Sequence, residues 1–249
     1  MMLLEGRNAV IYGGGGSVGG AVARAFAREG ATVHLAGRTA AKLDAVADAV
    51  RAAGGRAETA VVDALDEQAV DAHAERVAAG HGSLDISMSV ISQQDVQGTP
   101  LVELSVEDFM RPVDVTTRSF FITARAAARH MIRQRSGVIL AFGGYGDPWP
   151  NLGGLQVSFQ AVEALRRGLS VELGPHGIRV VTLQTNGIAE SISDPDFRAK
   201  IEAGIVANTM LERGATLDDV GNAAVFAASD WARTVTASKI NITCGGFVD

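Results

Sequence analysis

The sequence predicts an α/β protein, with a doubly wound parallel sheet of about seven strands between two layers of helices. Short apolar runs alternate with longer helical patterns along all 249 residues, and such alternation is typical of βαβ units. A glycine-rich turn follows the first apolar run and leads into a helical pattern. No linker, low-complexity tract or repeat divides the chain. One domain spanning residues 1–249 is therefore expected.

The first half of the chain contains four predicted strands. Each is a short run rich in apolar and β-branched residues, and glycines at 30 and 54–55 end the first two intervening helical patterns, as glycine commonly does. The strands are expected at residues 8–12, 32–36, 58–62 and 84–91. The helices between them are expected at residues 18–28, 40–53 and 66–79.

The second half continues the alternation. A helix is expected at 105–131, where Ser105 followed by Asp108 resembles a capping box. Residues 189–212 have the least regular pattern and are expected to form short helices that cover one end of the sheet. The remaining strands are expected at residues 138–142, 179–183 and 240–243. The remaining helices are expected at residues 155–173 and 217–228.

Composition excludes several classes of function. The chain has 22 Lys and Arg against 28 Asp and Glu, a net charge of −6, and no basic cluster, which disfavours binding to nucleic acid or to an anionic membrane. Cys244 is the single cysteine, so neither an intrachain disulfide nor a cysteine-based zinc site is possible. No apolar run has the length of a signal h-region or a membrane span. A cytoplasmic protein with a small-molecule substrate is expected.

No metal site is expected from the sequence. The five histidines are scattered and show no spacing that pairs them with a carboxylate and a nucleophile, so surface or packing roles are the default. They are His34, His73, His81, His130 and His176.

The glycine-rich turn predicts a phosphate-binding site. Gly14, Gly16 and Gly19 satisfy G-x-G-x-x-G, with a strand before and a helix after the motif. Glycines let the backbone approach a pyrophosphate, and the free N–H groups at the helix start attract its charge. A tight glycine corner without a ligand is the alternative. The residues expected to bind the cofactor here are Gly13, Gly16, Ser17, Val18 and Gly19, and Ser17 could also cap the helix.

Two further residues bear on the nucleotide. Arg38 follows the second strand at the position where an acid would bind the ribose of NAD and an arginine accommodates a 2′-phosphate. NADP(H) is therefore favoured over NAD(H), and a solvated cation at a helix start is the alternative. Asp63 ends the third predicted strand and could accept a hydrogen bond from the adenine amino group. Its alternative role is to cap the next helix, which Asp66 could do equally well.

The chain resembles the short-chain dehydrogenase/reductase family of single-domain type over essentially its whole length. The resemblance is carried by the glycine turn, Asp63, residues 170–180 (Ser-Val-Glu-Leu-Gly-Pro-His-Gly-Ile-Arg-Val), residues 226–230 and the glycines at 245–246. It implies a Rossmann-type NAD(P)-binding domain and homodimers or homotetramers formed through the 155–173 helix and the last strand. It also implies cofactor contacts at Ala64, Ser89, Ala189 and Ser191.

The chain departs from the family at the catalytic positions. The family tyrosine donates a proton and its lysine lowers the tyrosine pKa, but their positions are occupied here by Leu155 and Phe159. Thr116 stands at the asparagine position, and Gly144, or Gly143 in a shifted register, at the serine position. Only Tyr12 and Tyr145 are tyrosines, followed four residues later by Gly16 and Trp149. No Tyr-x-x-x-Lys pair therefore exists in the sequence.

Tyr145, just beyond the fifth strand, is the best substitute acid, and a packed loop tyrosine is its alternative. Asp147 beside it could be a general base or a turn residue before Pro148. Leu155 and Phe159 are expected to make the former proton-relay site apolar. The side chains expected to flank this cleft are Gln93, Gln94, Gln156 and Gln160.

Three functions remain open from the sequence. The first is an NADP(H)-binding oxidoreductase with a non-standard proton donor that reduces an activated C=C or C=O bond of a small apolar substrate. The second is a non-catalytic nucleotide-binding or partner subunit. The third is a redox-neutral lyase or isomerase that uses the same fold.

Overall fold

A computed structural model describes residues 2–144 and 150–247. Its centre is a seven-stranded parallel sheet in the order β3-β2-β1-β4-β5-β6-β7. The strands are β1 (Asn8–Tyr12), β2 (Thr32–Gly37), β3 (Arg56–Val61), β4 (Ile86–Ser89), β5 (Gly137–Gly144), β6 (Ile178–Thr185) and β7 (Ser238–Asn241).

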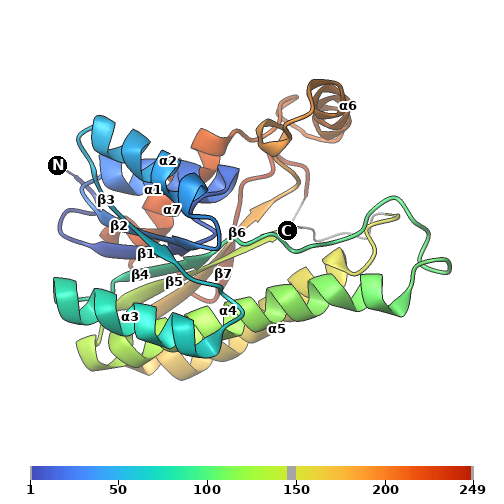
Figure 1. The fold of residues 1–249 in the computed structure, drawn as a ribbon. Coiled ribbons are helices and arrows are strands. Elements are labelled where there is room, and N and C mark those ends of the chain that lie inside the picture. The colour runs from blue at the N-terminus through green and yellow to red at the C-terminus, as the bar shows by residue number, and fades with distance from the viewer. Residues whose placement is uncertain (1, 145–149, 248–249) are drawn as a thin grey trace.

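Helices cover both faces of the sheet (Figure 1). One layer contains α1 (Ser17–Arg28), α2 (Ala40–Ala52) and α7 (Leu217–Ala228), and the other contains α3 (Glu67–His81), α4 (Val106–Gln134) and α5 (Leu155–Leu173). Helix α6 (Pro195–Val206) and a 3-10 turn at Ala189–Ser191 lie apart from these layers. The predicted three-layer, doubly wound architecture is confirmed.

The two-sided burial of the sheet explains its continuous apolar strands. In β1, Ala9 and Ile11 pack into the core beneath α1, α2 and α7, whereas Val10 and Tyr12 pack into the core on the α3 and α4 side. All five residues of β1 are buried. Each face of this strand therefore joins one helical layer to the sheet.

Several boundaries differ from the sequence-based prediction. β3 ends at Val61, where its pairing with Gly37 of β2 ends, so Asp63 lies in the following loop rather than at the strand end. β5 extends to Gly144 because Gly143 and Gly144 pair with β6. The irregular 189–212 segment contains one regular helix, α6.

The order of the strands positions the site. β1 lies between β2 and β4, with β2 and β3 toward one edge of the sheet and β4 to β7 toward the other. The strand order therefore reverses direction at β1. In open α/β sheets, ligands bind at such a switch point, outside the carboxyl ends of the strands.

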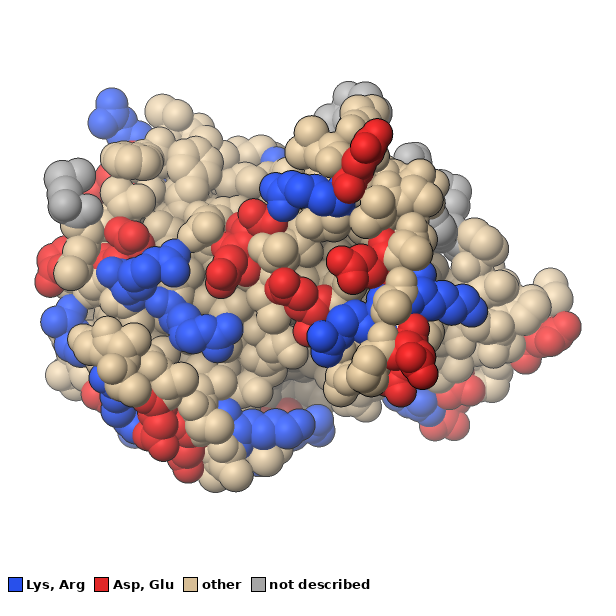
Figure 2. Space-filling model, turned by 90° about the horizontal axis from the view of Figure 1, so that it is seen from above, with Lys and Arg blue, Asp and Glu red and all other residues tan. Residues whose placement is uncertain are grey.

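The face of the molecule in Figure 2 carries acidic and basic side chains intermixed, without an extended area of one sign. Among the described residues, no helix is both long enough and apolar enough to span a membrane.

Candidate active site

Two adjoining clefts lie at the carboxyl ends of the central strands. The first has a volume of about 210 Å³ and lies between the glycine turn, the end of β2 and the loop after β3. The second has a volume of about 510 Å³ and lies between the start of α1, the loop after β4, the start of α5 and the end of β6. Both are lined by Gly16, Val90, Ile91 and Ser92. Together they offer room for an extended ligand.

The glycine turn brings backbone close to both clefts. Gly13 has a φ of 85°, and a Cβ at this position would lie 2.5 Å from the Val90 carbonyl oxygen. A Cβ on Gly19 would overlap the Gly13 carbonyl oxygen. These contacts explain why neither position tolerates a side chain in this backbone arrangement.

The start of α1 has no side chain that caps the backbone N–H groups of its first turn. Its N-cap is Gly16, without a side-chain cap, and Ser17 is already the first helical residue. The idea that Ser17 caps the helix is therefore wrong, because its hydroxyl comes one residue too late in the chain. The N–H groups of a first helical turn lack partners within the helix. Gly16, Ser17 and Val18 line the second cleft, so this end of α1 is suited to a pyrophosphate.

Two cations line the first cleft beyond β2. Arg38 lies in the short turn after Gly37, and Lys42 lies four residues later in the first turns of α2. Neither side chain forms an ion pair with a residue that the structure describes. Lys42 is a cleft residue that the sequence reasoning missed, because nothing in the local sequence links it to Arg38.

Asp63 and Ala64 line the first cleft from the loop after β3. The Asp63 Oδ1 accepts a hydrogen bond from the Leu65 N–H at 3.0 Å. The helix cap is Asp66, whose Oδ1 accepts from the Ala69 N–H at 3.0 Å. The alternative cap role of Asp63 is therefore wrong, and its carboxylate lies at the cleft.

The second cleft is apolar on its α5 side. Leu155 and Phe159 lie one turn apart, each 7% exposed, and both line the cleft with Phe142 and Ile188. Between them, Ser158 is fully buried and donates to the Leu155 carbonyl at 2.6 Å. The Leu155 and Phe159 side chains therefore both face this cleft, as expected, and its identity with the family's proton-relay site stays a prediction. Gln93 also lines this cleft, and Gln94 lines the first one. Gln156 and Gln160 are not among its described lining residues, because they follow Leu155 and Phe159 on another side of α5.

Comparison with known proteins decides the family. A family model described as enoyl-(acyl carrier protein) reductase matches residues 14–247. The chain belongs to the short-chain dehydrogenase/reductase family. Galactitol 2-dehydrogenase of Rhizobium johnstonii is 31% identical over 97% of this chain and 95% of its own length. Cis-4-hydroxycyclohexanecarboxylate dehydrogenase of Sinomonas cyclohexanicum is also 31% identical, over 97% of this chain and 96% of its own length.

Solved structures agree with this assignment. A short-chain type dehydrogenase/reductase from Mycobacterium ulcerans superimposes with a TM-score of 0.90 at 26% identity, over 98% of this chain and 90% of that one. A dehydrogenase/reductase from Sinorhizobium meliloti gives a TM-score of 0.86 at 27% identity, over 99% and 97% of the two chains. The protein is thus an oxidoreductase of the short-chain dehydrogenase/reductase family, whose members bind nicotinamide cofactors.

The residues predicted to stand at the family's serine and asparagine positions line two different spaces. Gly143 lines this cleft at the end of β5, and Gly144 is the last residue of the strand. Thr116 and Ser89 instead line a small cavity of about 10 Å³ between β4 and α4. The Thr116 Oγ1 is buried without a hydrogen-bond partner among the described residues. A polar cavity of this size accommodates about one water molecule.

The two tyrosines of this short-chain dehydrogenase/reductase have different prospects as acids. Tyr12 is 2% exposed, and its ring meets that of His73 edge to face at 5.8 Å. Burial, followed by the charge of Asp71, raises the pKa of Tyr12 well above its usual value, so it holds its proton. Tyr145 and Asp147 lie outside the described residues, and their proposed roles stay predictions.

The remaining predicted cofactor residues lie after β6. Ser191 lines the second cleft, and its Oγ donates to the Ile188 carbonyl at 2.7 Å. Ala189 begins the same 3-10 turn and is not among the described lining residues.

The structure also adds Thr185 and Asp95 to the second cleft. Asp95 is the one acidic or basic side chain among the described residues that line it, and it accepts from the Gln97 Nε2 at 2.6 Å. No sequence signal singles out Asp95, because its loop has no regular pattern.

Proposed function

We propose that the protein is an NADP(H)-dependent oxidoreductase that reduces an activated C=C or C=O bond of a small apolar substrate with a non-standard proton donor. The observation that carries the cofactor choice is the presence of Arg38 and Lys42 in the first cleft, beside the glycine turn. When bound, NADPH supplies the hydride.

The cation pair favours a 2′-phosphate over a free ribose. An acid after β2 would bind the two ribose hydroxyls of NAD, whereas this strand ends with Gly37 and is followed by Arg38. A phosphate carries charge that two cations can neutralise, and arginine binds it through two parallel hydrogen bonds. Lys42 adds a second positive charge to the same cleft.

The second cleft favours C=C reduction. Leu155 and Phe159 supply no proton where the family's tyrosine and lysine would stand. Hydride addition to an enone carbon gives an enolate, whose oxygen needs hydrogen-bond donors more than an immediate proton. Ser92, Gln93 and Thr185 offer such donors in this cleft. The matching family model, described as an enoyl reductase, supports the same chemistry.

The experiment is a substrate screen with the purified protein. NADPH consumption is followed with small cyclic and acyclic enones and, as matched controls, with the corresponding saturated ketones. We expect turnover of enones and at least tenfold slower turnover of ketones. An enzyme that reduces the ketones faster would contradict the C=C assignment.

A second candidate is a non-catalytic nucleotide-binding or partner subunit. The observation that favours it is the same apolar pair, since Leu155 and Phe159 remove both the acid and the lysine from the cleft. It predicts tight NADPH binding with no turnover across the screen. Co-purification with an active short-chain dehydrogenase/reductase subunit would then support the partner role.

A homodimer or homotetramer is proposed through α5 and β7. Helix α5 exposes Val157 and Val171, at 45% and 78%, and β7 is an edge strand with an open row of backbone groups. Val171→Glu is expected to shift the mass by light scattering toward the monomer. A monomeric unmodified protein would contradict this assembly.

The chain has a single cysteine, Cys244. Because disulfides are rare in the reducing cytoplasm, we propose a cytoplasmic location.

A further inference from the structure

A buried histidine lies outside both clefts, in the strand next to the β3 edge of the sheet. His34 is in the middle of β2 and is 2% exposed. Its position in the strand alternation directs it to the α3 side, since its neighbours Val33 and Leu35 pack into the other core. Its Nε2 has no hydrogen-bond partner among the described residues. A buried polar atom without a partner is costly, so its environment calls for an explanation.

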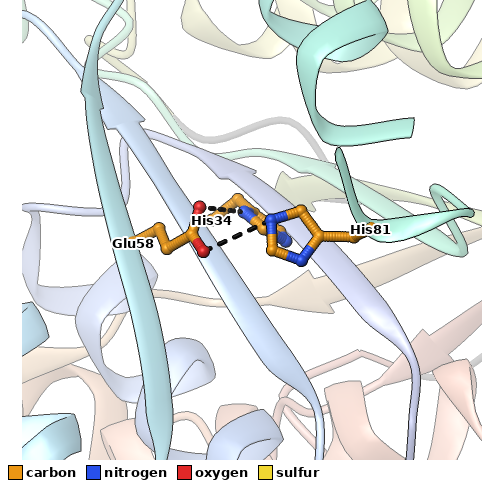
Figure 3. A group of neighbouring side chains, drawn as sticks. All are labelled: His34, Glu58 and His81. Carbon is orange, nitrogen blue, oxygen red and sulfur yellow. Dashed lines mark ion pairs between the residues drawn. The ribbon is translucent and has the colours of Figure 1, made fainter. Parts of the chain in front are cut away.

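Two further side chains meet His34 (Figure 3). Glu58 is its register partner on β3, and its Oε2 lies 3.5 Å from the His34 Nδ1. The other carboxylate oxygen of Glu58 lies 3.3 Å from the Nε2 of His81, the last residue of α3. The two imidazole rings are 4.5 Å apart between centroids. Two imidazoles and a carboxylate thus converge from three different elements.

We propose that His34, Glu58 and His81 form a binding site for a divalent transition-metal ion, with Zn²⁺ as the best match. One ligand atom from each residue can be chosen so that all lie within 4.8 Å of one another. Imidazole nitrogen and carboxylate oxygen are zinc ligands, and three protein ligands leave a fourth tetrahedral position for water. Mg²⁺ is disfavoured because it prefers oxygen ligands.

The geometry requires only modest adjustment. Tetrahedral zinc with bonds of about 2.0–2.1 Å places its ligand atoms about 3.3 Å apart, closer than the widest spacing here. The side chains of Glu58 and His81 are 57% and 29% exposed, so both can rotate inward, whereas the packed His34 stays in place.

The surroundings allow for both ion and water. The three residues line a cavity of about 180 Å³ that shares no lining residue with either cleft. His73 and Arg76 line the same cavity. Arg76 is exposed on α3, so its charge can turn toward water when a cation binds.

A metal here would tie the end of α3 to the β2–β3 edge of the sheet. The sequence-based expectation of no metal site rested on local spacing. That spacing cannot reveal ligands that come from β2, β3 and the end of α3, so only the fold brings them together.

The test uses the full-length, untagged protein after removal of metal with a chelator. Zn²⁺ is titrated in competition with a chromogenic chelator, and Co²⁺ is added as a visible-absorption probe. We expect one Zn²⁺ per chain and a rise in Tm that the same concentration of Mg²⁺ does not produce. His81→Ala and Glu58→Gln should each weaken Zn²⁺ binding at least tenfold, and His176→Ala, in the turn before β6 and away from β2, should not.

Two results would overturn the site: no Zn²⁺ bound by the unmodified protein, or equal binding by the His81→Ala and His176→Ala variants. His81 and Glu58 are both partly exposed, and circular dichroism checks that each variant folds. Glu58→Gln keeps the side-chain size and decides the matter if His81→Ala does not fold. NADPH binding should be unchanged in both variants, which separates this test from that of the proposed function.

Discussion

Leu155 and Phe159 line the same cleft from successive turns of α5, and each is 7% exposed. The sequence resemblance predicts that these are the positions of the tyrosine and lysine in the family's proton relay. Two hydrocarbon side chains therefore face the cleft at the place where the resemblance predicts a proton donor.

Restoring the pair should create ketone reduction. We expect Leu155→Tyr combined with Phe159→Lys to raise kcat/KM for small ketones by about 10²-fold or more, because a positioned general acid is typically worth about 10²–10⁴-fold. Phe159→Lys alone is the matched control, since it lacks the acid. The measurement is NADPH consumption with ketones. A folded double variant that binds NADPH but reduces ketones no faster than the control would contradict the assigned positions.

Tyr145 is the proposed substitute acid. Tyr145→Phe should lower kcat about 10²-fold or more with any accepted substrate, since it removes only the hydroxyl. NADPH affinity should stay the same, because the hydroxyl is proposed to act on the substrate. Single-turnover kinetics measures the rate, and a fluorescence titration measures the affinity. An unchanged kcat would assign the proton to another donor, such as water.

Gly19 is required by the backbone of the phosphate turn. We expect Gly19→Ala to lower the free energy of unfolding by about 1–3 kcal/mol, because its Cβ would overlap the Gly13 carbonyl oxygen. Gly168→Ala in α5 is the control, since its Cβ would meet nothing within 4 Å and alanine favours a helix by up to about 1 kcal/mol. Urea unfolding compares the two. Equal stability of both variants would show that the turn is not close-packed.

Stability should fall in mild acid because of His73. Burial and then the charge of Arg76 lower its pKa to about 4, below the value of about 6.5 for a free imidazole. The unfolded chain therefore binds this proton first, so stability is full above about pH 6.5 and is lost as the pH falls toward 4. At pH 5 the loss from this group is about 2 kcal/mol.

Urea unfolding at pH 7.5 and 5.0, with a chelator present, measures this loss. His73→Gln should reduce the difference between the two pH values, and the control His176→Gln should not. An equal pH dependence in all three proteins would rule out His73 as its source.

The order and type of the helices and strands were predictable because the spacing of apolar residues indicates which face of each element is buried. Both α5 and α7 match their predicted ranges, 155–173 and 217–228, since their apolar spacing is regular. The end of β3 was misplaced because Val62 is buried although it lies past the strand.

The site was predictable only where the backbone dictates it. The glycine turn and Arg38 follow from local sequence, and both line the clefts. Lys42, Asp95 and the His34, Glu58 and His81 cluster were not found, because their neighbours come from distant segments. Contacts between such segments depend on the order of the strands in the sheet, which single-residue spacing does not encode.

The central claim is that the protein prefers NADP(H), and it depends on Arg38 and Lys42 lining the same cleft. Titration of the purified protein with NADPH and NADH tests this claim most directly. Arg38→Ala and Lys42→Ala are measured beside the control Arg233→Ala, at the far end of the sheet. We predict that NADPH binds at least tenfold more tightly than NADH and that each cleft variant removes most of this preference while the control retains it. Equal affinity for the two nucleotides, or binding of neither, would contradict the proposed NADP(H)-dependent function.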